Sequence, residues 1–280
     1  MSLILTNTSN NENFVIDDIY TVYKVSNVLC YSYENYNSWK LKISSGNLEN
    51  YYFIIDTLYD DAFAHWIFES AIYLPLYNSL KKIYPHLKLL LKQEKKYKKI
   101  FCDFFGIKDV VYNLESNNVC FFPSPISSLN NNDISFEWKT HVIKFKDCFS
   151  TVLDLKYEFV ILPRQTAENY KNNDRTIDFN NLIKSLEKRS FVIETDKISD
   201  LNDQITKVNS SDKICLSEGS AFYVNGLFCK NKTIYVVDIS ETYKMQPVLY
   251  TKFNFLLNII KEANNIVYIS QNDLIRTLTL

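Results

Sequence analysis

The sequence contains very little glycine, with four residues in 280, and no excess of charge of either sign. Lys and Arg together number 31 against 32 for Asp and Glu, so the formal net charge is −1. Without a basic field the chain has no electrostatic means of holding nucleic acid or an anionic membrane, and we expect neither as a main partner. Because glycine is so scarce, each one is informative about the backbone around it.

The chain also lacks any stretch of about 18 apolar residues, the length that a transmembrane helix needs. Its first residues, MSLILTNTSNNEN, carry neither the basic segment nor the long apolar segment of a secretory signal. The six cysteines form no C-x-x-C pair and lie mostly in apolar runs, where cysteine behaves as a small buried hydrophobe. We therefore expect reduced core thiols in a cytoplasmic protein without a transmembrane segment.

The first half of the chain has the pattern of strands followed by alternating helices and strands. Hydrophobic residues make up 46% of the sequence, as in globular proteins. Alternation of apolar and polar residues over 14–56 predicts strands. A predicted helix over 61–82 follows, with Pro75 as a kink or stop. The remaining expected elements are a strand at 86–92, a helix at 93–106 ending at Gly106, strands in DVVYN and NVCFFP, and a loop over 124–137.

The second half repeats strands and helices more regularly. Helices are expected at 176–190, at 199–211 with a Ser cap, and at 220–230. Strands are expected at 156–164, 191–195, 213–219, 233–240 and 265–270. This repetition predicts an α/β protein with a parallel sheet covered by helices on both faces. Two such domains, 1–150 and 151–280, would form a cleft between them.

One polar stripe interrupts the apolar segment DDAFAHWIFESAIYL. In a helix, Asp61, His65 and Glu69 fall on one face at spacing four, and Asp60 or Asp61 can cap the helix start. Such a stripe suits a helix that lines a cleft, with histidine as a general base whose ordinary pKa lies close to neutral. The alternative is a core histidine that is hydrogen-bonded to a carboxylate.

Two arginines flank the segment after a predicted strand. Arg164 follows the strand directly and Arg175 precedes the next helix, which is where phosphates bind in open α/β sheets. Guanidinium groups offer fork-shaped donors to phosphate oxygens, so the pair suits a diphosphate. Two solvated surface arginines are the alternative.

The segment Ser217-Glu218-Gly219-Ser220 joins a predicted strand to a predicted helix. Gly219 allows a ligand to approach the backbone closely. Ser220 can cap the helix, whose free N–H groups would face an anion. Glu218 could accept hydrogen bonds from ribose or sugar hydroxyls. An ordinary strand-to-helix turn is the alternative.

These motifs occur in a recognisable order: His65-Trp66-x-x-Glu69, a strand ending at Arg164, Arg175, Gln204, the turn at Gly219, and Asn225-Gly226-Leu227-Phe228. In this order the chain resembles glycosyltransferase family 61, a former domain of unknown function. That family includes plant xylosyl- and arabinosyltransferases and animal O-linked GlcNAc transferases. The resemblance covers roughly residues 50–240. Many members read H-G-A at the last turn, where this chain has Glu218-Gly219-Ser220.

The resemblance implies a GT-B-like fold, in which two Rossmann-like domains face each other across a cleft. The 151–280 domain would bind the nucleotide-sugar, a UDP-linked substrate, through Arg164, Arg175, Glu218, Gly219, Ser220 and Asn225. The 1–150 domain would bind a glycan, lipid-linked or protein acceptor, with His65, Glu69 or Asp61 as the catalytic groups. It further implies inverting transfer of a hexosyl or pentosyl group without a metal or other cofactor. The absence of any D-x-D motif agrees with the last point.

Two other functions remain open at the level of sequence. The departure at Glu218 motivates a non-catalytic, nucleotide-sugar-binding subunit of glycan assembly. Another α/β nucleotidyl- or phosphotransferase would fit the same strand and helix pattern.

Overall fold

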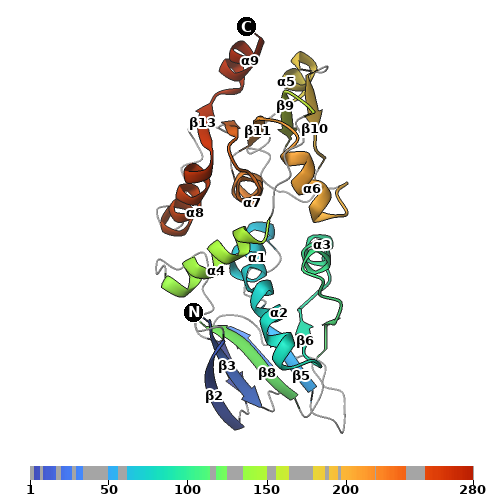
Figure 1. Ribbon diagram of the computed structural model, residues 1–280, viewed down its shortest axis with the longest axis vertical. Helices are drawn as coiled ribbons and strands as arrows, with labels where there is room; N and C mark the ends of the chain where they lie inside the picture. Colours follow the sequence, from blue (N-terminus) through green and yellow to red (C-terminus); the bar gives the residue numbers. More distant parts are fainter. Residues whose placement is uncertain are drawn as a thin grey trace. The chain divides into compact units, whose positions relative to one another are not determined.

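The chain forms two compact units, residues 1–145 and 146–280. The computed structural model describes residues 3–6, 9–16, 20–26, 30–33, 50–55, 62–113, 118–124, 135–149, 156–163, 179–186, 189–194, 197–217, 219–237 and 250–279. Each unit contains its own sheet, and both sheets include parallel strands (Figure 1). The expected α/β class with parallel sheets is confirmed.

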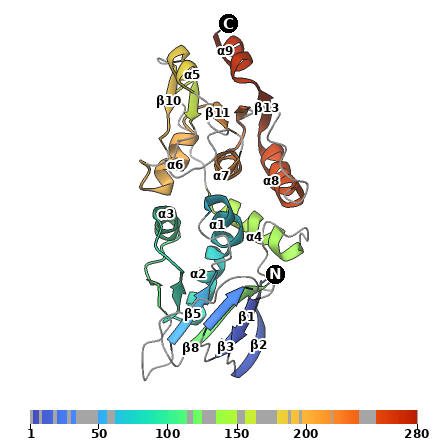
Figure 2. The ribbon, with the colours of Figure 1, turned by 180° about the vertical axis from the view of Figure 1, so that it is seen from behind.

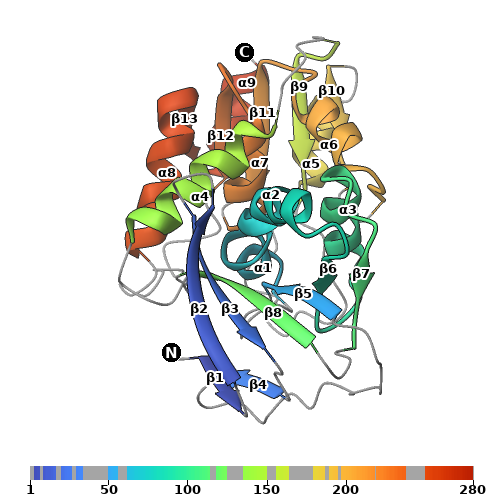
Figure 3. The ribbon, with the colours of Figure 1, turned by 60° about the horizontal axis from the view of Figure 1, so that its bottom comes forward.

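The first unit contains a mixed sheet of six strands in the order β2-β3-β8-β5-β6-β7 (Figure 3). Its strands are β2 (Ser9–Ile16), β3 (Tyr20–Ser26), β8 (Asn118–Ser124), β5 (Asn50–Ile54), β6 (Lys88–Leu90) and β7 (Val110–Val111). Strands β2, β3 and β8 pair antiparallel, whereas β8, β5, β6 and β7 pair parallel. A separate pair, β1 (Leu3–Thr6) and β4 (Cys30–Tyr33), is antiparallel.

The helices of the first unit follow the parallel strands along the chain. They are α1 (Phe63–Glu69), the 3₁₀ turn η1 (Ala71–Tyr73), α2 (Leu74–Ile83), α3 (Lys96–Phe104) and α4 (Phe136–Asp147). The segment predicted as one helix over 61–82 is therefore broken before Pro75. Proline fits the first turn of α2, where its missing N–H would have no partner in the helix. Helix α3 ends just before Gly106, whose φ is +68°.

Two fully buried tryptophans connect the helices of the first unit. The Trp138 indole N–H of α4 donates to the Phe68 carbonyl of α1 at 3.0 Å. The Trp66 ring packs on Tyr97 and Phe101 of α3, with centroid distances of 5.6 and 5.9 Å. These contacts fix α1 between two neighbouring helices, and α1 carries one of the predicted motifs.

The second unit contains a five-stranded sheet in which all pairs are parallel. The order is β10-β9-β11-β12-β13. The strands are β9 (Phe159–Leu162), β10 (Ser190–Val192), β11 (Lys213–Ser217), β12 (Thr233–Val237) and β13 (Asn265–Ile269). Four of the five strands lie within a predicted strand segment and β10 begins one residue before its segment, so the predicted parallel sheet is confirmed.

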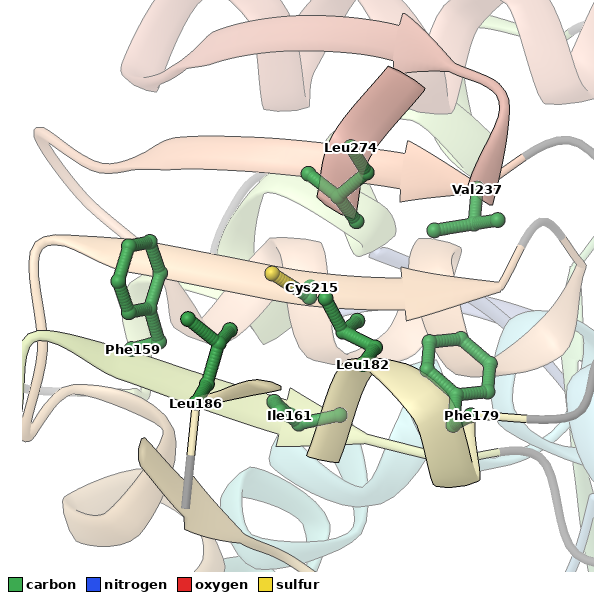
Figure 4. Packing of buried hydrophobic residues seen from close by; sticks show 8 residues of the cluster. All are labelled: Phe159, Ile161, Phe179, Leu182, Leu186, Cys215, Val237 and Leu274. Atoms are coloured by element: carbon green, nitrogen blue, oxygen red, sulfur yellow. The ribbon is translucent and has the colours of Figure 1, made fainter. Parts of the chain in front are cut away.

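Helices cover both faces of this second sheet, as predicted (Figures 1 and 2). They are α5 (Asn180–Ser185), α6 (Leu201–Val208), α7 (Ser220–Phe228), α8 (Tyr250–Ala263) and α9 (Gln271–Thr279). Helices α5 and α9 share one face, where Leu182 and Leu274 belong to a single apolar cluster (Figure 4). Helices α6, α7 and α8 lie on the other face (Figure 2).

The apolar cluster on the α5 and α9 face uses alternate residues of the strands. Ile161 of β9, Cys215 of β11 and Val237 of β12 all point into it (Figure 4). Because side chains alternate along a strand, Ser217 lies on the same face as Cys215. The sequence of β11 thus places a polar side chain at the end of an otherwise apolar row.

Two helix caps differ from those expected. Helix α6 is capped by Asp200, whose carboxylate accepts from the Asn202 N–H at 2.8 Å, and not by a serine. Aspartate is as good a cap as serine, and here it is the residue that adopts the extended backbone before the first turn. Helix α7 begins at Ser220 itself, with Gly219 at the cap position, so the Ser220 side chain is not the cap.

Candidate active site

The strand order of the second sheet defines where a ligand would bind. Numbered along the chain within the unit, the strands lie in the order 2-1-3-4-5, so the connections reverse direction between β9 and β11. In open parallel sheets, ligands bind outside the carboxyl ends of the strands at such a reversal. Leu162 pairs with Leu216 at this edge, which sets Pro163 beside Ser217. The end of β9 and the end of β11 therefore form the candidate site of this unit.

Three of the predicted ligand-binding residues, Arg164, Arg175 and Glu218, lie outside the described residues. The described neighbours nevertheless fix the strand ends from which two of them continue. Arg164 follows Pro163 after β9, and Glu218 follows Ser217 after β11.

The turn at Gly219 has a backbone conformation that requires glycine. Its φ is +111° and its ψ is −151°, a region that residues with a side chain hardly populate. Among the described residues, no heavy atom outside the adjacent chain lies within 4 Å of the place where a Cβ would be. The turn thus leaves open space in front of the start of α7, where the first N–H groups have no partner within the helix. Gly219 and Ser220 fulfil the local geometry that an anion site needs.

Ser217 is a polar residue at this edge to which the sequence alone assigned no role. It is 1% exposed, and its Oγ has no hydrogen-bond partner among the described residues. Buried hydroxyl groups are normally hydrogen-bonded, so an orphaned one requires an explanation. The period of two along β11 was the available signal, because it places Ser217 on the same face as the buried Cys215.

Two motif residues of the second unit contact each other. The Gln204 side-chain amide of α6 donates to Asn225 Oδ1 of α7 at 2.7 Å. Asn225, only 2% exposed, in turn donates through Nδ2 to the Ala221 carbonyl at 2.8 Å. Both ends of the Asn225 amide are thus used within the protein, which favours a positioning role for this residue over direct ligand contact.

The first unit has a comparable reversal in its parallel strands. Numbered along the chain, β5, β6, β7 and β8 lie in the order 3-2-1-4, with the reversal between β5 and β8. Phe53 of β5 pairs with Phe121 of β8 near the carboxyl ends. Helix α1 is the helix that follows β5 in the chain, so its motif residues come from this end of the sheet.

His65 and Glu69 form a close pair on α1. His65 Nδ1 lies 2.7 Å from Glu69 Oε1. The Glu69 side chain is fully buried, whereas the His65 side chain is 22% exposed. The predicted pairing at spacing four is therefore present in the structure. The third predicted member, Asp61, lies outside the described residues, as does Asp60.

This arrangement can hold a histidine ready to accept a proton. When Nδ1 carries the ring proton it donates to Glu69, and Nε2 then keeps its lone pair. The carboxylate also fixes the orientation of the ring and stabilises the charged imidazolium that forms after proton uptake. The pair has the chemistry of a general base with its orienting partner.

The described ranges bring together no group of three or more His, Cys, Asp or Glu side chains that could hold a metal ion. In the same part of the chain, every helix is too short or too polar to span a lipid bilayer.

A family description matches the region that carries these features. The family model for Glycosyltransferase 61 matches residues 63–236, which is more than half of the 280 residues. The match begins at the first residue of α1 and ends within β12, so it includes His65, Glu69 and Gly219. No curated protein matches the chain. On the strength of the family match, this chain belongs to the glycosyltransferase 61 family.

Proposed function

We propose that this protein is an inverting, metal-independent glycosyltransferase with a GT-B arrangement. It moves a hexosyl or pentosyl group from a UDP-linked donor to a glycan, lipid-linked or protein acceptor. Family membership supports glycosyltransferase activity. The finer proposal is carried by one observation: the strand order reverses within the parallel part of the sheet in each unit, and the His65–Glu69 pair follows one reversal whereas the Gly219 turn follows the other.

In this proposal the second unit binds the donor. Arg164 and Arg175 contact the diphosphate through their guanidinium groups, and the N–H groups at Gly219 and Ser220 contact it through the backbone. Glu218 accepts a hydrogen bond from a ribose or sugar hydroxyl. Asn225 acts as a positioning residue, because its side-chain amide donates to the Ala221 carbonyl and so fixes the first turn of α7.

The first unit supplies the base. The acceptor hydroxyl oxygen attacks the anomeric carbon, its proton passes to His65 Nε2, and the bond between that carbon and the diphosphate oxygen breaks. One displacement inverts the anomeric centre. The leaving diphosphate takes the electron pair, and the arginines with the start of α7 stabilise its charge in place of a metal. Glu69 stabilises the charged imidazole, and Asp61 is the alternative base.

A non-catalytic subunit that binds nucleotide-sugars is the second candidate. It is favoured by Glu218, which occupies the position where many family members have histidine. A carboxylate there would repel a diphosphate that an imidazole could contact. The replacement of histidine by Glu218 can therefore alter donor binding and turnover to different extents.

The deciding experiment is a panel of UDP-sugars in which release of UDP is followed with and without acceptor glycans. We expect turnover with at least one donor, and we expect it to persist in EDTA. His65→Ala protein prepared in parallel controls for contaminating activity. Tight donor binding by calorimetry without turnover would favour the second candidate. Turnover that vanishes in EDTA and returns with Mn²⁺ would contradict the metal-independent mechanism.

We also propose that the protein works in the cytoplasm. Cys102, Cys120, Cys215 and Cys229 are buried, and none of these four forms a disulfide. Burial raises the pKa of the Cys215 and Cys229 thiols to about 12, so both stay protonated and inert. This state suits a reducing compartment. Recovery of the protein from the membrane or extracellular fraction of its native cells would contradict the proposal.

A further inference from the structure

Strand β13 lies at an edge of the second sheet and is open to pairing with another strand. It is last in the strand order, and among the described residues no strand lies beyond it (Figure 1). An edge strand presents a row of unpaired backbone N–H and C=O groups. All five residues of Asn265–Ile269 are at least partly exposed, and Tyr268 is 47% exposed. The pairing with β12 is regular over the whole strand, so no bulge turns this edge away.

The two helices that flank β13 in the chain pack toward the middle of the sheet. Leu274 of α9 belongs to the same apolar cluster as Val237 of β12 (Figure 4). Phe253 of α8 packs on Tyr223 of α7, with a centroid distance of 4.7 Å. Their buried residues therefore hold α8 and α9 over the faces of the sheet rather than along the outer side of β13.

The opposite edge of the same sheet is protected. Strand β10 has only three residues, Ser190–Val192, and follows directly on Arg189. Lys207 Nζ lies 6.0 Å from the centre of the Phe191 ring. Short strands and charged side chains are the usual means of preventing edge-to-edge pairing. Strand β13 lacks both, and residues 263–272, which include it, contain no charged residue and no proline. The contrast between the two edges indicates that β13 meets a partner.

We propose that β13 pairs antiparallel with β13 of a second copy of this chain, about a two-fold axis at Val267. Such an axis brings each residue near it close to its own counterpart, so charged residues there would repel each other. The uncharged segment around β13 meets this condition. In this register Tyr268 lies opposite Ile266 of the partner subunit, and an aromatic residue opposite a β-branched one is a favourable cross-strand pair. Five strands from each copy then form one sheet of ten.

This pairing leaves the candidate active site untouched. The reversal between β9 and β11 is separated from β13 by β12. The carboxyl ends of β9 and β11 therefore stay as they are in the single chain. The inference goes beyond the proposed function and does not depend on it.

A lysine at the exposed tyrosine separates the paired from the single chain. Tyr268→Lys removes both aromatic pairs of the dimer and brings charge to its seam, so it should raise the dimer Kd by about tenfold or more. The fold should persist, because about half of this side chain is exposed. Tyr157→Lys is the matched control at the opposite edge, where Tyr157 is 39% exposed and stacks on Phe191. It should leave the dimer Kd unchanged.

Cysteine variants test the register. Directly opposed residues of antiparallel strands have Cα atoms roughly 4.5–5.5 Å apart, which is within the range of a disulfide. Val267→Cys should therefore crosslink two copies under mild oxidation. Ile266→Cys places its thiol opposite Tyr268 of the partner subunit and should not crosslink. Both substitutions are made in Cys148→Ser protein, because Cys148 is an exposed thiol.

The experiment is sedimentation equilibrium of the full chain and the two lysine variants, with non-reducing gels for the cysteine variants and circular dichroism to verify folding. A dimer that Tyr268→Lys weakens and Tyr157→Lys preserves supports the proposal. A monomeric unaltered chain overturns it, and so does a dimer that Tyr268→Lys leaves intact. Crosslinking of Val267→Cys alone supports the antiparallel register, and any other crosslinking result overturns that register.

Discussion

At the scale of single residues, the His65–Glu69 pair stands out for the unequal exposure of its two members. The carboxylate is fully buried and the imidazole is 22% exposed, so the ring can meet a substrate while its partner stays shielded from water. A buried carboxylate interacts more strongly with a neighbouring charge than an exposed one does. The buried carboxylate therefore fixes the orientation of a ring that itself stays accessible.

The role of His65 can be separated from mere core packing by measuring turnover and stability on the same variants. If His65 is the base, His65→Ala should lower kcat by about 10²–10⁴, with little change in donor binding. Glu69→Gln keeps the side-chain shape, so it should lower kcat while the melting temperature changes little. The measurements are kcat with the best donor of the panel and thermal unfolding of both proteins.

The exposed His86 is the matched control for this pair. His86→Ala should leave kcat and melting temperature unchanged. A His65→Ala protein with a lowered melting temperature and near-normal kcat would return His65 to a purely structural role and leave the base unassigned.

His141 on α4 is a histidine of the opposite kind. It is 1% exposed and packs edge-on against the Tyr73 ring at a centroid distance of 4.5 Å. Burial, with a smaller contribution from the Lys144 charge, lowers the pKa of His141 from 6.5 to about 3. The folded protein thus keeps this ring neutral, whereas the unfolded chain takes up a proton below pH 6.5.

This difference predicts a loss of stability in acid. Between about pH 6.5 and 3 the unfolded state binds more protons than the folded state at His141, so the free energy of unfolding falls as the pH falls. From pH 7 to pH 5 the contribution of this one residue is about 2 kcal/mol. Urea unfolding at both pH values should show that much more loss in the unaltered protein than in His141→Gln, which cannot titrate. Equal losses in the two proteins would mean that His141 is already protonated in the folded state.

At the scale of elements, α6 and α7 are joined at two places by side-chain amides. Gln204 contacts Asn225, and Asn225 contacts the Ala221 carbonyl in the first turn of α7. At the far end, Asn209 Nδ2 donates to the Phe228 carbonyl at 2.9 Å. Only the first of these links reaches the turn in which the proposed donor site lies.

The two links should therefore differ in their effect on donor binding. Gln204→Ala leaves Asn225 Oδ1 buried without its donor, which destabilises the fold by roughly 1–3 kcal/mol and loosens the start of α7. We expect a melting temperature lower by several degrees and weaker binding of UDP. Asn209→Ala should lower the melting temperature similarly but leave UDP affinity intact. Equal UDP affinities in both variants would mean that the Gln204 link supports the fold alone.

Elements whose residues follow a clear period could be predicted from the sequence. The five strands of the second sheet and helix α3 have such patterns, and each lies inside its predicted segment except β10, which begins one residue early. Helices α4, α8 and α9 were not predicted. In α8 the run FNFLLNII is apolar on consecutive residues, and such a run does not distinguish a buried helix from a strand. The break between α1 and α2 followed from Pro75, because proline acts locally.

At the scale of the whole molecule, the site could be predicted only as separate motifs. Residue spacing within one helix predicted the His65–Glu69 pair, since a helix has a fixed period. Gln204 and Asn225 lie on α6 and α7, which are separated along the chain by strand β11. No local period therefore encodes the contact between them. The orphaned state of Ser217 depends on what surrounds β11 in three dimensions. Site residues could therefore be predicted from the sequence where a single element carries them. They were harder to predict where the order of the strands in the sheet brings them together.

If the second unit binds the donor and the first unit supplies the base, UDP affinity and turnover should respond to different substitutions. If the donor binds through the second unit, Arg164→Ala and Arg175→Ala should each weaken UDP binding by roughly ten- to a hundredfold, because each removes a charge-assisted hydrogen bond. His65→Ala, in the first unit, should leave UDP affinity unchanged although it abolishes most turnover. Calorimetric titration of UDP into the three variants tests both statements, and Arg189→Ala serves as the arginine control. Arg189 pairs with Glu158 on the surface, at the amino end of the second sheet, where no donor contact is proposed. Unchanged affinity in both Arg164→Ala and Arg175→Ala would rule out a diphosphate clamp at this end of β9.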